Sequence, residues 1–114
     1  MTEKIYKILT PDQWSDALAE GSFKGAPIDL ADGYIHFSTA EQVEETADKH
    51  FRNTGNLLLA AFDGATFGDK LRWEASRGGA LFPHLYAELD PKLALEVYDL
   101  PQNEDGRHQF PENY

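Results

Sequence analysis

Residues 57–62, Leu-Leu-Leu-Ala-Ala-Phe, form an unbroken apolar run that ends at the turn dipeptide Asp63-Gly64. The run has the length of a strand rather than of a helix. Side chains of a strand point alternately to its two sides, so a run that is apolar at every position predicts a strand covered on both faces. We therefore interpret residues 57–62 as a central strand with a structural role.

Two helices are predicted in the N-terminal half of the chain. The first begins at Thr10-Pro11-Asp12-Gln13, where threonine can cap, proline suits the first helical position and glutamine can reach back to the cap. The second begins at a cap on Ser38 or Thr39 and ends within residues 53–55. Each helix therefore starts directly after a predicted strand.

Further strands are predicted before and after the central run, at residues 5–9, 34–37, 71–76, 82–89 and 93–100. Residues 22–32 show no lasting period and are interpreted as a loop, and residues 101–114 as a loosely held tail. Helices near the start followed by runs of strands predict an α+β fold with mainly antiparallel pairing. At 114 residues the chain fits one compact domain, residues 1–114.

Charge and composition exclude several classes of function. The formal net charge is −10, from 20 acidic and 10 basic residues, and such a surface repels nucleic acid backbones. The chain has no cysteine, which excludes disulfides, thiolate zinc sites and cysteine nucleophiles. No stretch approaches the roughly 18 apolar residues of a membrane span, and the N-terminus lacks a signal pattern. We expect a cytoplasmic protein with neither nucleic acid nor membrane as a partner; protein partners are not predicted.

The segment Tyr34-Ile35-His36-Phe37-Ser38 carries the first group of candidate functional residues. Alternation along a strand puts Ile35 and Phe37 on one side, where they suit a core, and Tyr34, His36 and Ser38 on the other. The second set offers an aromatic ring, an imidazole and a hydroxyl beside a capped helix start, whose free N–H groups favour an electronegative ligand. A strand histidine is also a common structural hydrogen-bonding residue, so both interpretations remain open.

The segment Phe82-Pro83-His84-Leu85-Tyr86 carries the second group. The same alternation places Phe82, His84, Tyr86 and Glu88 on one side of the strand. Pro83 lacks a backbone donor and is therefore expected at the start or exposed edge of a strand, such as the rim of a cleft. Again an aromatic ring and an imidazole share one face.

Arg72 and Glu74 precede the second segment and are two residues apart on a predicted strand. They share one face, while Leu71 and Trp73 point to the other and are interpreted as core. The two charged residues form either an exposed salt bridge or a carboxylate that an arginine holds in position for chemistry.

Two other kinds of site are disfavoured. The four histidines and Glu74 supply enough donor atoms for zinc or iron, but no two histidines stand at the His-x-His or His-x-x-x-His spacing of specific metal motifs. A serine nucleophile at Ser38 lacks the Gly-x-Ser-x-Gly turn, and Ser38 also suits a helix cap. We therefore expect no metal and no serine-histidine-acid triad.

Together these segments resemble the bacterial domain-of-unknown-function family numbered 952 over nearly the whole chain. The matching residues are Ile5-Tyr6, Trp14, Gly33-Tyr34-Ile35-His36-Phe37-Ser38-Thr39, Gln42, Arg72-Trp73-Glu74 and Phe82-Pro83-His84-Leu85-Tyr86. The family is thought to be a distant relative of the ADP-ribosyltransferases, whose fold is a pair of small, mainly antiparallel sheets that grip NAD in a cleft between them. The resemblance thus implies an ADP-ribosyltransferase-like split sheet.

The resemblance also implies roles for individual residues. In that superfamily a strand histidine, often followed two residues later by serine or threonine, binds the ribose and carboxamide portions of NAD, and His36 and Ser38 match this pattern. An aromatic residue stacks on nicotinamide and a late glutamate holds a ribose hydroxyl, and Tyr86 and Glu74 are the candidates. Their order departs from the usual histidine, tyrosine, glutamate, which leaves Glu88 as an alternative acid.

The resulting prediction is an ADP-ribosyltransferase-like protein that uses NAD or a related nucleotide as a substrate. Its catalytic candidates are His36, Glu74, His84 and Tyr86, and its substrate-binding candidates are Tyr34, Ser38 and Arg72. The alternative is a non-catalytic module on the same fold that binds a small ligand or a protein through the same aromatic and histidine face.

Overall fold

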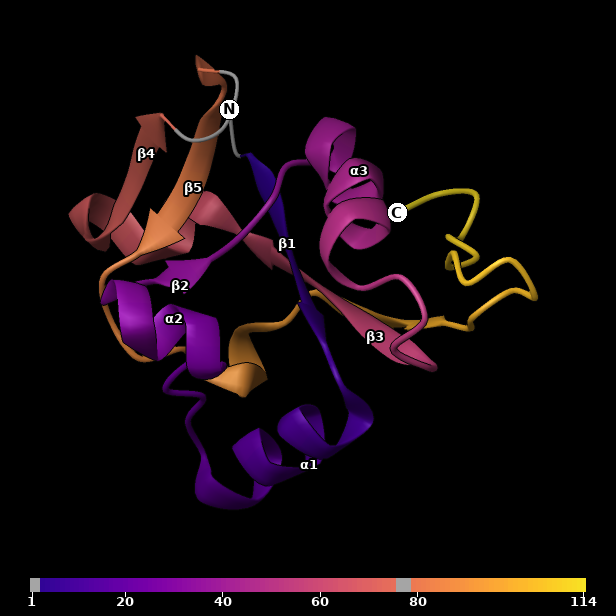
Figure 1. Cartoon of the computed structure of the whole chain (residues 1–114). Helices are drawn as coiled ribbons and strands as arrows, with labels where there is room; N and C mark the ends of the chain where they lie inside the picture. The colour runs from indigo at the N-terminus through magenta and orange to yellow at the C-terminus, as the bar shows by residue number, and fades with distance from the viewer. Residues whose placement is uncertain (1–2, 76–78) are drawn as a thin grey trace.

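The computed structural model describes residues 3–75 and 79–114 and contains two three-stranded antiparallel sheets (Figure 1). The first sheet has the order β1-β3-β6, with β1 at Lys4–Leu9, β3 at Leu57–Asp63 and β6 at Glu96–Leu100. The second has the order β2-β5-β4, with β2 at Ile35–His36, β5 at Leu81–Leu85 and β4 at Leu71–Ala75. The predicted α+β class with antiparallel pairing is therefore confirmed.

The helices are α1 (Pro11–Glu20), α2 (Pro27–Asp32) and α3 (Ala40–His50), with 3-10 turns η1 (Gly64–Lys70) and η3 (Pro91–Leu93). The expected capping box of α1 is present, because the Thr10 hydroxyl accepts from Gln13 N–H and the Gln13 side chain accepts from Thr10 N–H. Within the described ranges, no helix is long and apolar enough to cross a membrane.

Residues 22–32 are not all loop, because they contain the six-residue helix α2. Pro27 stands at its first position, and the Asp29 carboxylate accepts a hydrogen bond from the Ala26 N–H, which would otherwise lack a partner. Gly33 ends the helix at φ +87°, a left-handed conformation that favours glycine. The loop interpretation was wrong here because six residues are too few to reveal a helical period.

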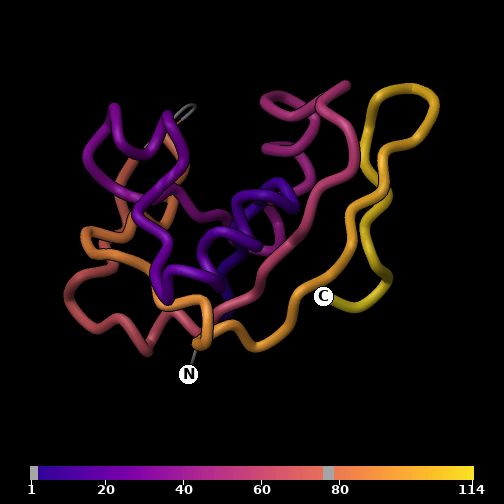
Figure 2. The backbone as a smooth tube through the Cα atoms, turned by 90° about the horizontal axis from the view of Figure 1, so that it is seen from below, coloured from indigo at the N-terminus to yellow at the C-terminus, as the bar shows by residue number. Residues whose placement is uncertain are grey.

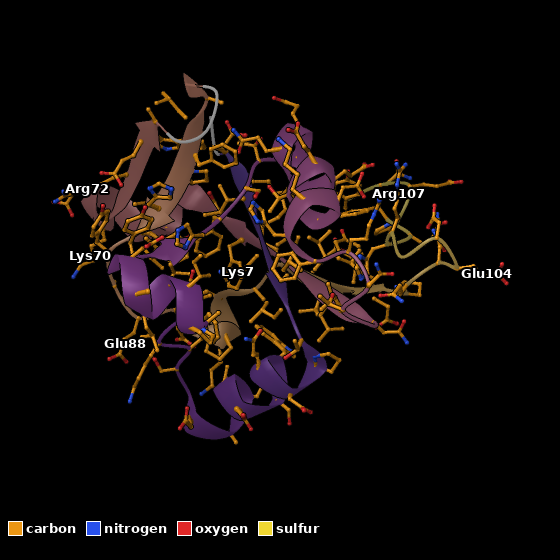
Figure 3. All side chains as sticks on the ribbon, viewed as in Figure 1. Lys7, Lys70, Arg72, Glu88, Glu104 and Arg107 are labelled. Carbon is orange, nitrogen blue, oxygen red and sulfur yellow. The ribbon has the colours of Figure 1, made fainter. Side chains whose placement is uncertain are left out.

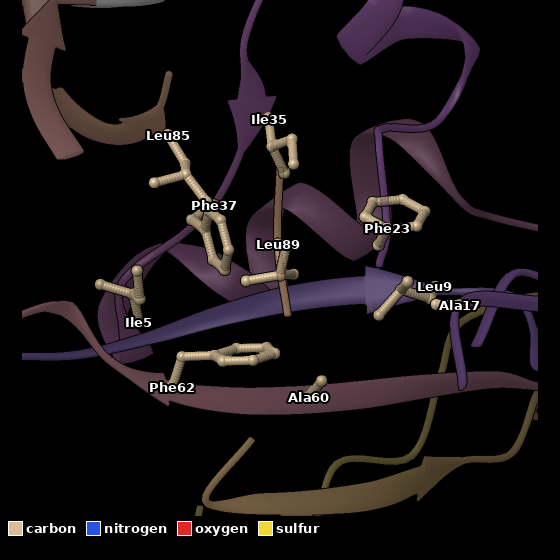
Figure 4. Packing of buried hydrophobic residues seen from close by; sticks show 10 residues of the cluster. All are labelled: Ile5, Leu9, Ala17, Phe23, Ile35, Phe37, Ala60, Phe62, Leu85 and Leu89. Carbon is tan, nitrogen blue, oxygen red and sulfur yellow. The ribbon is translucent and has the colours of Figure 1, made fainter. Parts of the chain in front are cut away.

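The core lies between the two sheets (Figure 4). Phe62 and Ile5 of the first sheet face Ile35 and Leu85 of the second, with Phe37 packed edge-on against Phe62. The opposite face of β3 packs in a second cluster with α3 and the end of the chain, through the residues Tyr6, Ile8, Val43, Ala47, Leu57, Leu59, Ala61 and Leu100. The predicted central strand is thus covered on both faces.

Several predicted strand features differ from the structure. The strand predicted at 82–89 ends at Leu85, and one further bond in the same register, from the Tyr86 N–H to the Lys70 carbonyl, follows it. Trp73, interpreted as core, is 39% exposed. Leu71 on the same face of β4 does pack against the core cluster. The edge strand therefore extends past the apolar surface that the first sheet offers.

The C-terminal segment after Leu100, which we expected to be loosely held, makes specific contacts with the rest of the chain. Figure 2 shows it folding back alongside the segment that enters β3. His108 Nε2 lies 2.8 Å from the Gly55 carbonyl oxygen, and the Tyr114 ring packs edge-on against Tyr6 at 5.5 Å. This segment covers the α3 side of the first sheet.

Candidate functional site

Two histidines and an arginine share one rung on the outer face of the second sheet. His36 of β2 pairs with His84 of β5, and His84 pairs with Arg72 of β4. The neighbouring rung, Ile35, Leu85 and Leu71, faces the core, so alternation turns the His36 rung away from the first sheet. The two imidazole centroids are 5.5 Å apart. The resemblance implies a cleft between the sheets, whereas these side chains lie on the outer face of one of them.

Tyr34 joins these groups into a single aromatic cluster. Its ring stacks on His84 with centroids 4.1 Å apart, and lies 4.7 Å from His36 and 5.3 Å from Tyr86. His84 is therefore only 4% exposed, although it stands on an outer face. Burial, followed by the charges of Asp32 and Glu74, raises the pKa of Tyr34. The hydroxyl of Tyr34 accordingly stays protonated.

Glu74 lies at the edge of this cluster and is held by two donors. Its Oε1 accepts from the Tyr86 hydroxyl at 2.7 Å and lies 2.8 Å from His84 Nδ1. The hydrogen bond from Tyr86, followed by that from His84, lowers the pKa of Glu74. The Tyr86–Glu74 bond also raises the pKa of Tyr86. The carboxylate is therefore kept ionised and fixed in place.

Arg72 stacks on an aromatic ring, with its guanidinium carbon 4.7 Å from the Tyr86 ring centroid. Its charge contributes to the lowered pKa of Glu74, but only after the hydrogen bonds from Tyr86 and His84. Figure 3 places Arg72 at the outer edge of the second sheet, and Lys7 in the interior. Of the two interpretations offered for Arg72 and Glu74, the positioned carboxylate fits better, although Tyr86 and His84 do most of the positioning.

Asp29 of α2 is a central residue of the site that sequence reasoning missed. Its side chain is 1% exposed and accepts from Lys7 Nζ (3.0 and 3.2 Å), Ala26 N–H (2.8 Å) and His36 N–H (3.1 Å), and its Oδ1 lies 2.6 Å from His36 Nδ1. Burial would raise its pKa, but the bond with His36, the charge of Lys7 and the backbone donors outweigh burial and lower it to about 2. Asp29 is therefore ionised at neutral pH.

Lys7 is the charged partner of this buried carboxylate. It is 6% exposed and also donates to the His36 carbonyl oxygen at 2.9 Å. Burial lowers the pKa of Lys7, and Asp29 opposes this shift. A lysine in the otherwise apolar strand Ile5-Tyr6-Lys7-Ile8-Leu9 was the signal in the sequence that could have revealed a buried acidic partner.

Asp32, one turn further along α2, reaches the other nitrogen of His36. Its Oδ2 is 3.0 Å from His36 Nε2, and the Asp32 side chain is 44% exposed. The two ring nitrogens of His36 thus contact two carboxylates in very different environments, one buried and one open to solvent.

Two predicted site residues lie outside the cluster. Ser38 is 5% exposed, and its hydroxyl is 3.3 Å from the Thr46 hydroxyl on α3. Its backbone pairs with Tyr6 of the first sheet. The Glu88 carboxylate accepts from the Ser22 hydroxyl at 2.8 Å. Ser38 is one of the seven predicted site residues, and the other six, Tyr34, His36, Arg72, Glu74, His84 and Tyr86, lie in the cluster or at its edge.

A pocket of about 310 Å³ adjoins the cluster and shares Tyr34 and Asp29 with it. Its lining consists of Lys24, Asp29, Leu30, Gly33, Tyr34, Ile35, Leu85, Ala87 and Glu88. In the part of the chain that the structure describes, no group of three or more histidine or acidic side chains is arranged to hold a metal ion. The cluster offers hydrogen-bonding groups, aromatic faces and ionised carboxylates.

Comparison with known proteins gives a family and a fold. The family model "Protein of unknown function (DUF952)" matches residues 8–97. The crystal structure of CC0527 from Caulobacter crescentus is 49% identical, covers 93% of each chain and has a TM-score of 0.90. A crystal structure of a double mutant of CC0527 gives the same values, and its solution NMR structure has a TM-score of 0.83, with 93% of this chain and 91% of that chain covered. A search of curated proteins found no match.

Proposed function

This chain belongs to the DUF952 family, and from that premise we propose that it binds NAD or a related nucleotide on the outer face of the second sheet and transfers ADP-ribose. The observation that carries the proposal is Glu74, an ionised carboxylate that Tyr86 and His84 hold beside a group of aromatic rings. Loss of nicotinamide from NAD leaves an oxocarbenium-like ribose, which such a carboxylate stabilises.

The neighbouring groups suit the rest of the ligand. The rings of Tyr34 and Tyr86, 5.3 Å apart, offer faces to a flat nicotinamide. His36 supplies a hydrogen-bonding nitrogen for a ribose hydroxyl or carboxamide. Ser38, to which the resemblance also gives a binding role, turns toward α3, so the proposal rests on His36 without it.

The size of the pocket limits how much of a dinucleotide it can enclose. Its volume of about 310 Å³ is at the lower end of ligand pockets, which is enough for one ring system. The diphosphate would then lie across the open surface, where Lys24 on the pocket wall and Arg72 on the sheet edge provide positive charge in a protein of net charge −10.

A non-catalytic binding module is the second candidate, and one observation favours it. Glu74 Oε1 is shared by Tyr86 and His84, and Tyr34 covers His84. A ligand must therefore move Tyr34 to reach His84. A surface that binds a ligand through Tyr34, Tyr86 and Arg72 without turnover would need no such movement.

Isothermal titration of NAD and of ADP-ribose into the purified protein tests the proposal. We expect saturable binding that is lost in His36→Ala and Tyr86→Ala, after circular dichroism confirms that both variants are folded. Tyr86→Phe removes only the hydroxyl that bonds Glu74 and keeps the ring, so binding should persist if the ring is what contacts the ligand. Tyr98→Phe, whose hydroxyl lies near Asn113 on another face, is the matched control.

Nicotinamide release separates the two candidates. If the protein is a transferase, water or an added acceptor takes the ADP-ribose, so incubation with NAD releases nicotinamide, and Glu74→Gln abolishes release while binding persists. Binding without release in the wild-type protein would establish the non-catalytic module. Absence of binding at millimolar NAD and ADP-ribose would refute the nucleotide proposal and leave a module that binds another small ligand or a protein.

A further inference from the structure

His36 is the point on which a buried ion pair converges. We propose that Asp29, with Lys7 as its counter-ion, is a positioning residue that keeps the proton on His36 Nδ1 and leaves Nε2 as the ring nitrogen that exchanges protons and contacts a ligand. The inference deepens the proposed function, because it names the atom of His36 that would work. Its test requires no ligand, so the two proposals can fail separately.

Stability alone does not account for the ion pair. Lys7 and Asp29 are 6% and 1% exposed, and two charges lose much of their hydration at such sites. Apolar residues of similar volume often serve equally well or better in a protein core. Three contacts of the pair end on one residue: Asp29 to the N–H and to Nδ1 of His36, and Lys7 to its carbonyl oxygen. Both the backbone and the ring of His36 are fixed by this arrangement.

The position of the proton follows from the chemistry of Asp29. A carboxylate whose pKa is about 2 is ionised above pH 4 and can only accept hydrogen bonds. Nδ1 of His36 lies 2.6 Å from Asp29 Oδ1, so Nδ1 must carry a proton there. Lys7 balances the negative charge of Asp29. His36 therefore does not need a second proton, on Nε2, to neutralise that buried carboxylate.

On the Nε2 side of the ring, a ligand atom can take the place of the Asp32 carboxylate. Its partner, Asp32, is 44% exposed and stands at the end of a short helix. Because exposed ion pairs contribute little to stability, a hydroxyl, carboxylate or phosphate oxygen of a ligand can replace the Asp32 carboxylate at little cost. Asp32 thus occupies the position of the ligand's acceptor atom.

Other titratable groups also lie close to His36. His84 of β5 lies beside it at 5.5 Å between ring centroids, and Tyr34 at 4.7 Å. Glu74 of β4 stands behind His84, to which it is bonded. Tyr34 has a raised pKa and stays neutral. Among the residues that the structure describes, Asp29 is therefore the charge bonded to Nδ1, with Lys7 bonded to Asp29, and Asp32 is the charge at Nε2.

Side-chain ¹⁵N NMR of the full chain, labelled at histidine, tests the proposal through a pH titration. We expect the Nδ1 signal of His36 to stay at the position of a protonated nitrogen throughout, while the Nε2 signal alone moves. Asp32→Asn should keep this pattern, and Asp16→Asn, an exposed acid on α1, is the charge control. Loss of the Nδ1 proton while Nε2 keeps its own would overturn the proposal.

The double variant Lys7→Met/Asp29→Leu removes both charges and keeps apolar volume in their place. With no acceptor at Nδ1 and Asp32 still at Nε2, we expect the neutral ring of His36 to switch its proton to Nε2. A folded double variant that retains the Nδ1 proton would show that Asp29 does not set the tautomer. The wild-type titration decides the proposal even where the double variant does not fold.

Discussion

Replacing Lys7 by methionine should expose how strongly the interior depends on one ion pair. The change removes the partner of a carboxylate that is 1% exposed and leaves the remaining hydrogen bonds of Asp29 in place. Breaking a buried pair on one side costs about 3–5 kcal/mol. We expect about 3 kcal/mol, since the Ala26 and His36 donors still stabilise the charge. That is a large part of the roughly 5–15 kcal/mol available to a domain of this size.

Urea unfolding followed by tryptophan fluorescence measures this loss. With a slope of about 1.5 kcal/mol/M, the midpoint should fall by about 2 M. Lys92→Met is the matched control, because Lys92 is exposed, and should change the free energy of unfolding by less than about 0.5 kcal/mol. The double variant Lys7→Met/Asp29→Leu should be less destabilised than Lys7→Met alone, because it leaves no unpaired charge.

Two results would refute this reasoning. A Lys7→Met variant within about 1 kcal/mol of the wild type would mean that Asp29 does not depend on Lys7. A double variant destabilised by the full sum of the single changes would mean that the two charges do not interact in the folded protein.

Three further predictions concern acid stability, the core and ligand exchange. The folded-state pKa of Asp29 is lowered from 3.8 to about 2, so its ionised form contributes about 2 kcal/mol of stability above pH 4. This contribution is lost as the pH falls toward 2. Urea midpoints across this range should show the loss in the wild type but not in Lys7→Met/Asp29→Leu. Phe62→Ala, which empties a fully buried site between the sheets, should cost about 3–5 kcal/mol by the same assay, and a loss below about 1 kcal/mol would contradict the packing described. Asp32→Asn should tighten binding of ADP-ribose about twofold, because the ligand no longer displaces an ion pair, and an unchanged or weaker affinity in titration calorimetry would contradict the exchange at His36 Nε2.

The sequence predicted features whose cause is local. Thr10 and Gln13 cap α1 because their side chains reach groups only three residues away. The inward positions of Ile35 and Phe37 follow from alternation along a strand. Alternation predicted one row of functional side chains around His36 and another around His84. The pairing of the two histidines across β2 and β5 depends on strand register, which local patterns do not determine.

Features set by distant parts of the chain could not be predicted. Asp29 meets Lys7 across 22 positions of sequence, and no local pattern links a strand lysine to an acid in a six-residue helix. Trp73 is apolar and points to the core side of β4, yet its exposure depends on where the other sheet ends. Strand alternation puts Ser38 on the same side as His36, but Ser38 forms a bridge with Tyr6 of the first sheet and lies outside the site.

Helix α2 explains why one histidine can have a fixed nitrogen and an exchangeable one. Asp29 and Asp32 are three residues apart, so they lie on the same face of the helix and reach the two sides of one imidazole. Asp29 stands in the first turn, where its bond to the Ala26 N–H and the pairing with Lys7 hold it inside the protein. Asp32 stands in the last turn, just before Gly33, and is open to solvent. Movement of Asp32 therefore leaves the contacts of Asp29 intact, so a ligand bound at Nε2, as we propose, would not disturb the buried charges.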